Sequence, residues 1–163
     1  MKRTLDPIAQ LMQEHDEALI QLKKLNKAVR AFSIDGYSTR NFHTIVSALK
    51  FIDKEVSVHN MKEENTLFPV IESYVEGPTN NLRNDHKLLK KKFFQLAKAV
   101  VDVKKHPDSF SSIKNLKMVS QSIAQILVNH IHKENYILFP LVQRFLGKDE
   151  LREIAVKMFR PKF

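Results

Sequence analysis

The chain carries one pattern twice: HNMKEENTLFP at residues 59–69 and HIHKENYILFP at residues 130–140. In both copies a histidine is followed four residues later by a glutamate, and then by Leu-Phe-Pro. Residues four apart project from nearly the same face of a helix, so each copy presents an imidazole and a carboxylate together. The pattern is therefore typical of a helix that offers two polar groups to a common centre.

The repeat extends through most of the chain at a fixed offset of 71 residues. Matched positions include Pro7 and Pro78, Leu11 and Leu82, His15 and His86, and Ile52 and Ile123. Such a repeat indicates two helical hairpins built on one plan. It also sorts the seven histidines, because only His15, His86, His59 and His130 are matched by a histidine in the other half.

Glycine and proline are rare, with three and six copies, and they fall between segments of helical periodicity. We expect helices over residues 6–32, 39–66, 78–105 and 109–138, followed by a short tail helix over residues 149–159. Asp6 is expected to cap the first helix, with Pro7 at its first position. Pro69 and Pro140 are expected to end or kink the helices that contain them.

Apolar residues recur within these segments at alternating spacings of three and four. In the second segment they are Phe42, Ile45, Leu49, Ile52 and Val56. This spacing is typical of the inward seam of an antiparallel helical bundle. We therefore predict an all-α protein, an up-down-up-down four-helix bundle with a short C-terminal helix, forming a single domain over residues 1–163.

The composition excludes several kinds of chemistry. Without cysteine, the chain has no disulfide framework, thiolate zinc site, cysteine-ligated iron–sulfur cluster or cysteine nucleophile. Its apolar runs are far shorter than the roughly 20 residues of a spanning helix, and residues 1–7 do not resemble a signal peptide. We therefore expect a cytoplasmic protein with no membrane partner.

The net charge of +9 is interpreted as a solvated, lysine-rich helical surface. A nucleic-acid partner is not expected, because no arginine-rich or aromatic-interleaved stretch accompanies the charge.

The apolar stripes place six ionisable side chains in the interior: His15, His59, Glu63, His86, His130 and Glu134. An unpaired ionised glutamate in an apolar interior costs several kcal/mol or becomes protonated. No lysine or arginine occupies the seam positions. A metal cation is therefore the candidate for the compensating charge.

The number of candidate ligands favours two metals over one. Four imidazole nitrogens and two carboxylates saturate a single octahedral ion, but carboxylates also bridge two ions a few Å apart. If both glutamates and a solvent-derived oxo or hydroxo group bridge the ions, each ion has five ligands and an open position for a small ligand. Mixed imidazole and carboxylate ligation suits iron, with manganese and zinc as alternatives.

These residues resemble the hemerythrin-like HHE cation-binding domains, and the resemblance covers roughly residues 6–142. It implies a non-haem di-iron centre inside a four-helix bundle, with Glu63 and Glu134 as bridging ligands and the four repeated histidines as terminal ligands. Respiratory hemerythrins, which bind dioxygen reversibly, use five histidines, one glutamate and one aspartate. The His4Glu2 set of this chain is more similar to the di-iron domain of iron-centre repair proteins. The lack of cysteine argues against the thiol chemistry of those repair proteins.

Several neighbouring residues are not expected to bind metal. His132 is two positions from His130, about 200° around the helix, and so points away from it. Glu64 and Asp16 are interpreted as solvated charges, because their neighbours Glu63 and His15 occupy the inward positions. The Glu-x-x-His motif of ferritin-like proteins and the HExxH motif of metalloproteases are both absent. An apolar lid over the metals is expected from Leu67, Phe68, Leu138 and Phe139.

We expect a binding protein rather than an enzyme: a di-iron module whose open position takes O2 or NO, for carrying, scavenging or sensing. The alternatives are an iron-donating or stress-response protein of iron-centre repair, and a di-iron enzyme that processes peroxide or NO. A third alternative is a purely structural bundle that holds zinc or no metal. Without metal, the negative charges of two core glutamates would have no compensating positive charge.

Overall fold

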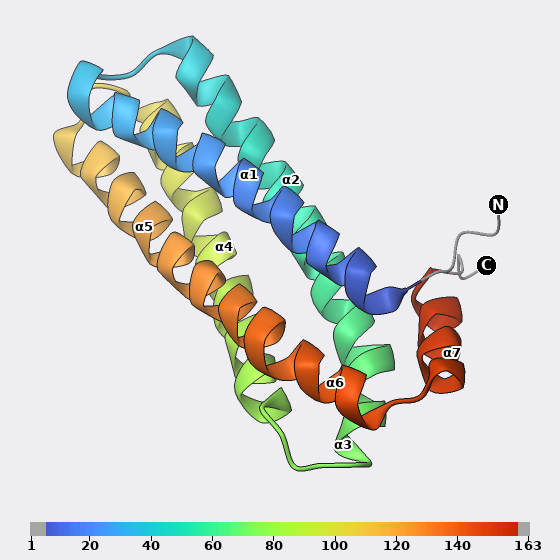
Figure 1. Ribbon diagram of the computed structural model, residues 1–163. Coiled ribbons are helices and arrows are strands. Elements are labelled where there is room, and N and C mark those ends of the chain that lie inside the picture. Colours follow the sequence, from blue (N-terminus) through green and yellow to red (C-terminus); the bar gives the residue numbers. More distant parts are fainter. Residues whose placement is uncertain (1–5, 160–163) are drawn as a thin grey trace, which may run out of the picture.

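The computed structural model describes residues 6–159, and every regular element within them is a helix (Figure 1). The four long helices are α1 (Pro7–Asp35), α2 (Thr39–Lys62), α4 (Thr79–Lys105) and α5 (Phe110–Lys133). The short elements are η1 (Glu63–Leu67), α3 (Phe68–Glu72), η2 (Glu134–Leu138), α6 (Phe139–Phe145) and α7 (Lys148–Phe159). The predicted antiparallel four-helix bundle with a short C-terminal helix is confirmed. No helix of the described residues is long and apolar enough to cross a membrane.

The long helices pack in the order α1, α2, α4, α5 around the bundle, since α1 contacts α2 and α5 while α4 contacts α5 and α2 (Figure 1). Their inward stripes form two separate apolar clusters. The large cluster includes Leu22, Leu25, Phe32, Ile45, Ile52, Leu89, Leu96, Leu116 and Ile123. The small cluster includes Ile8, Leu11, Leu67, Phe68, Leu82, Leu138, Phe139, Ile154 and Met158. Helices α1 and α4 each contribute to both clusters, whereas α2 and α5 contribute to the large cluster and reach the small one through η1, α3, η2 and α6. Polar residues occupy the interval between the clusters.

Polar caps set the beginnings of three long helices. The Asp6 carboxylate accepts hydrogen bonds from the N–H groups of Ile8 and Ala9, so the predicted cap ahead of Pro7 is confirmed. Ser38 and Ser109 cap α2 and α5 in the same manner. The first helix continues past residue 32, where we expected its end, because the chain leaves the helix only at Gly36. Gly36 has φ +83°, a conformation that favours glycine.

The helices that carry the repeated motif do not end where we expected, at residues 66 and 138. Each passes through one π-helical turn, in which the Phe68 N–H donates to the Glu63 carbonyl five residues earlier. The helix then continues through Pro69 to Glu72, and residues 134–145 repeat this arrangement. A proline has no N–H, and its ring crowds the carbonyl four residues back, so the wider turn accommodates it without ending the helix.

Helix α7 covers the end of the bundle that contains the repeated motif (Figure 1). It contacts α1 and η1 and buries Ile154 and Met158 in the small cluster. This helix therefore completes the small cluster at that end of the bundle.

Candidate metal centre

All six candidate residues lie in the interval between the two apolar clusters. His15 is on α1, His59 on α2, Glu63 begins η1, His86 is on α4, His130 on α5, and Glu134 begins η2. The two glutamates are 0 % exposed and the four histidines 2–6 % exposed. The prediction that these side chains point inward is confirmed, and every long helix contributes one histidine.

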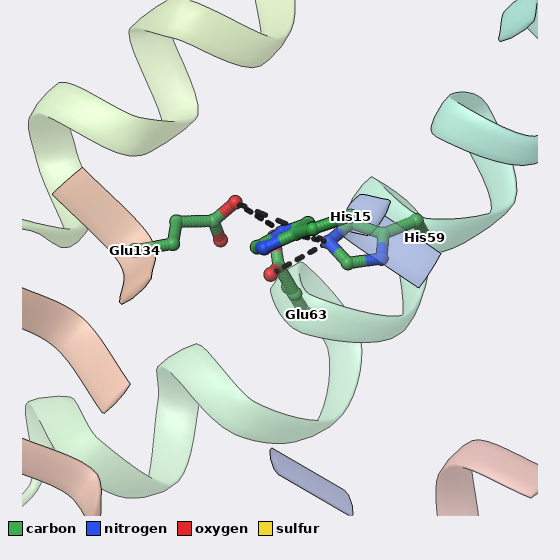
Figure 2. A group of neighbouring side chains, drawn as sticks. All are labelled: His15, His59, Glu63 and Glu134. Carbon is green, nitrogen blue, oxygen red and sulfur yellow. Dashed lines mark hydrogen bonds and ion pairs between the residues drawn. The ribbon is translucent and has the colours of Figure 1, made fainter. Parts of the chain in front are cut away.

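The first hairpin consists of α1, α2 and η1, and the second of α4, α5 and η2. The first group of candidate ligands contains His15, His59 and Glu63 of the first hairpin together with Glu134 of the second (Figure 2). The Nε2 atoms of His15 and His59 lie 3.0 Å apart. The Nε2 atom of His59 lies 3.0 Å from Oε1 of Glu63, and that of His15 lies 3.2 Å from Oε1 of Glu134. These four ligand atoms therefore converge on one point.

The second group uses the same two glutamates with the other two histidines. The Nε2 atoms of His86 and His130 are 3.1 Å apart. The Nε2 atom of His86 lies 3.4 Å from Oε2 of Glu63, and that of His130 lies 2.8 Å from Oε1 of Glu134. Glu63 thus turns one oxygen toward each histidine pair, which is the arrangement of a bridging carboxylate.

These distances and this burial suit metal cations. Two ligands at right angles on an ion, each about 2.1 Å from it, lie about 3.0 Å apart, close to the spacings of both groups. Both oxygens of Glu63 and of Glu134 are buried without a hydrogen-bond partner. Within residues 6–159, no lysine or arginine nitrogen forms an ion pair with either carboxylate. The site therefore contains more electron-pair donors than positively charged partners, and bound cations would supply the missing positive charge.

The pKa values of the site residues in the metal-free protein also indicate that the two glutamates require positive charge nearby. Burial lowers the pKa of His59, but the charge of Glu63 and contacts with Glu134 and Glu14 outweigh it and raise that pKa well above the usual range. Burial also lowers the pKa of His130, and the charge of Glu134 outweighs it. The pKa of Glu134 is well below its usual range, because contacts with Glu63 and His130 outweigh its burial. Protons on imidazole therefore supply positive charge when no cation does.

The outward-facing Nδ1 atom of each histidine faces a polar side chain, at hydrogen-bond distance for His15, His86 and His130 and at ion-pair distance only for His59. In the first hairpin, Nδ1 of His59 lies 3.4 Å from Glu14, whose carboxylate accepts a hydrogen bond from Lys62 at 3.1 Å. In the second hairpin, Nδ1 of His130 lies 3.2 Å from Asp85, which accepts one from Lys133 at 2.9 Å. Such contacts hold an imidazole in the orientation and tautomer that leave Nε2 free for a metal.

The other two histidines are held across the hairpins. Nδ1 of His15 lies 2.8 Å from the Asn135 side-chain oxygen, and Nδ1 of His86 lies 3.0 Å from a carboxylate oxygen of Glu64. Glu64 belongs to neither ligand group and is 34 % exposed in its side chain, in keeping with a partly solvated charge, but it also contacts His86. Our reading of the sequence missed all four outer partners. The repeat contained the signal, since Glu14 matches Asp85 and Glu64 matches Asn135.

Aromatic rings cover the site on the side of the small cluster. The ring of Phe139 stacks on His15 with centroids 5.6 Å apart, and that of Phe68 stacks on His86 at 5.7 Å. Both phenylalanines are at most 1 % exposed. The predicted apolar lid is therefore present, and it keeps the imidazole faces away from water.

A small cavity adjoins the site on its other side. It has a volume of about 20 Å³ and is lined by His15, His59, His130 and Glu134 at its inner end, with Glu17 and Glu55 also contributing. This volume slightly exceeds the roughly 10–15 Å³ that one water molecule requires. The cavity therefore admits only a very small ligand.

The three unmatched histidines lie outside the site. His43, His106 and His132 are exposed, and His132 stacks on the ring of Tyr136 with centroids 5.2 Å apart. The predicted outward direction of His132 is therefore confirmed. Asp16 is also exposed, as expected.

A helical bundle with a buried layer of histidines and shared glutamates is a metal-binding bundle. Residues 6–142 match the family model of the hemerythrin HHE cation binding domain. The match covers all six candidate residues, and the chain belongs to this family. A search of curated proteins finds no match to the chain.

Proposed function

We propose that the protein holds two iron ions and binds a diatomic ligand, O2 or NO, at an open coordination position, in order to carry, scavenge or sense it. The observation that carries the proposal is the sharing of Glu63 and Glu134 between two histidine pairs. When bound, the iron pair supplies redox-active ions that take small ligands directly. The ligand set of four histidines and two glutamates suits iron by its mixture of imidazole and carboxylate donors.

The roles of the residues follow from their positions. Glu63 and Glu134 would bridge the two ions, with His15 and His59 on one and His86 and His130 on the other. The partners at Nδ1 hold the rings in place, so little rearrangement is needed for binding. The lid of Phe68 and Phe139 excludes water and larger substrates, and the cavity of about 20 Å³ limits access to a small molecule. This combination favours ligand binding over chemistry on a large substrate.

Metal analysis combined with optical spectroscopy tests the proposal. We expect about two irons per chain, and a spectrum that changes reversibly on exposure of the reduced protein to O2 or NO. A colourless protein that contains only zinc would contradict it. Iron that is lost rapidly to a chelator after oxidation would favour iron donation instead, and catalytic consumption of peroxide or NO would favour an enzyme.

Ligand variants test the assignment of the residues. Glu63→Ala and Glu134→Ala are expected to abolish binding of the two metal ions together, because each variant removes a carboxylate that both ions would share. His132→Ala is the matched control, since its ring is exposed and stacks on Tyr136. Equal loss of metal in all three variants would refute the proposed ligands.

A further inference from the structure

The two hairpins surround their histidines with the same kinds of group at every position but one. A carboxylate that pairs with a lysine approaches His59 and likewise His130. The remaining partner differs: His15 faces the neutral amide of Asn135, whereas His86 faces the carboxylate of Glu64. The environment of His86 and His130 therefore contains one more negative charge than that of His15 and His59.

This extra charge acts directly on a ligand candidate. The distance from Nδ1 of His86 to the Glu64 carboxylate is 3.0 Å, and within residues 6–159 Glu64 forms no ion pair with lysine or arginine. A carboxylate that accepts the Nδ1 proton increases the basicity of the imidazole and strengthens its bond to a cation. An amide oxygen does this more weakly, because it carries no net charge.

Cavities adjoin both positions and do not distinguish them. The cavity of about 20 Å³ is lined by His15 and His59, together with His130. A larger one, of about 310 Å³, is lined by His86 and Glu64. The order of the two positions therefore rests on the charge of Glu64.

We propose that the two metal positions are unequal: a cation fills the His86/His130 position first and more tightly, and the His15/His59 position is filled second. The inference rests on the proposed two-metal site and adds an order to it. Glu64 is the positioning residue that sets this order, because its negative charge lies next to Nδ1 of His86.

Titration of the metal-free full chain with Zn²⁺ tests the order, because this ion is diamagnetic and leaves histidine ring signals visible by NMR. In the wild-type protein, the ring signals of His86 and His130 are expected to shift with the first equivalent, and those of His15 and His59 with the second. Calorimetry is expected to show two steps separated by about 10-fold or more in affinity.

Two isosteric variants change the charge in opposite senses. Glu64→Gln is expected to weaken the first step by about 10- to 100-fold and to abolish the order of filling. Asn135→Asp is expected to strengthen binding at His15 and His59, which brings the two steps together. Asp16→Asn is the control, because it removes the same charge next to His15 from an exposed side chain. Circular dichroism of each variant verifies that the helices are intact.

The outcomes separate this inference from the function on which it rests. Two Zn²⁺ ions that fill all four histidines together in the wild-type protein, or an unchanged order in Glu64→Gln, would overturn the inference alone. A wild-type chain that binds fewer than two cations would overturn both. Ordered filling that Glu64→Gln abolishes and Asp16→Asn preserves would support the inference.

Discussion

Replacing Glu134 by glutamine in the metal-free protein is predicted to remove a pH-dependent part of the stability. The Glu134 side chain is 0 % exposed, and its Oε1 atom lies 2.8 Å from Nε2 of His130 and 3.2 Å from Nε2 of His15. Glutamine preserves the shape of the side chain and removes only the charge. The variant therefore isolates the interaction between the carboxylate and its imidazoles.

The direction of the pH dependence follows from the two partners. The pKa of Glu134 is lowered well below 4.5, so its contribution to stability is present above 4.5 and is lost as the pH falls through the lowered pKa. The pKa of His130 is raised above 6.5, so its contribution is present below 6.5 and is lost as the pH rises through the raised pKa. The pair is therefore fully formed between pH 4.5 and pH 6.5.

Removal of one partner of a buried ion pair costs about 3–5 kcal/mol, and we expect a loss of this order for Glu134→Gln at about pH 6. At a pH above the raised pKa of His130, the wild-type protein has itself lost imidazolium charge and retains an uncompensated carboxylate, so the difference should shrink or reverse. Urea unfolding of protein treated with a chelator measures both values. The exposed Glu76 provides the control variant Glu76→Gln, which should change little at either pH. An equal cost of Glu134→Gln at the two pH values would refute the reasoning.

Three further predictions concern the surroundings of the site. His86→Ala should lower the metal content, while His132→Ala should leave it unchanged by metal analysis, because only the first ring is buried among the candidate ligands. Phe139→Ala should lower the free energy of unfolding by about 3–5 kcal/mol in urea and accelerate metal loss to a chelator, since it removes a buried ring that stacks on His15. Pro140→Ala should weaken metal binding in calorimetry more than it lowers the melting temperature, because it lets the turn that begins at Glu134 relax toward an α-helix. Unchanged affinity in Pro140→Ala, or unchanged metal loss in Phe139→Ala, would contradict these explanations.

The bundle and the interior position of the six side chains could be predicted because both depend on local spacing. A residue three or four positions from an apolar seam residue shares its face, whatever the rest of the chain does. His59 follows Val56 by three residues, and Glu63 follows His59 by four, so burial of Val56 predicts burial of both. The match between the halves then extended this conclusion to His130 and Glu134.

The outer partners and the π-helical turns could not be read from the same rule. Glu64 contacts His86 on α4, and Asn135 contacts His15 on α1, so each contact depends on how one hairpin lies against the other. On its own helix, Glu64 adjoins an inward residue and points between two helices, where spacing alone assigns no partner. The π-helical turn depends on where the helix accommodates Pro69, and the proline marks the strain without determining whether the helix ends or widens.

The distribution of the ligands couples metal binding to folding. Each long helix contributes one histidine, and each glutamate contacts histidines of both hairpins, so neither complete group exists until the hairpins have packed together. An unfolded chain therefore lacks the site, and the free energy of cation binding adds to the stability of the folded state. The two apolar clusters hold the bundle together on both sides of a layer that, without a cation, contains uncompensated carboxylate oxygens. The metal-free protein should accordingly be the less stable form, and most so above the raised pKa values of His59 and His130, where protons on imidazole no longer substitute for the cation.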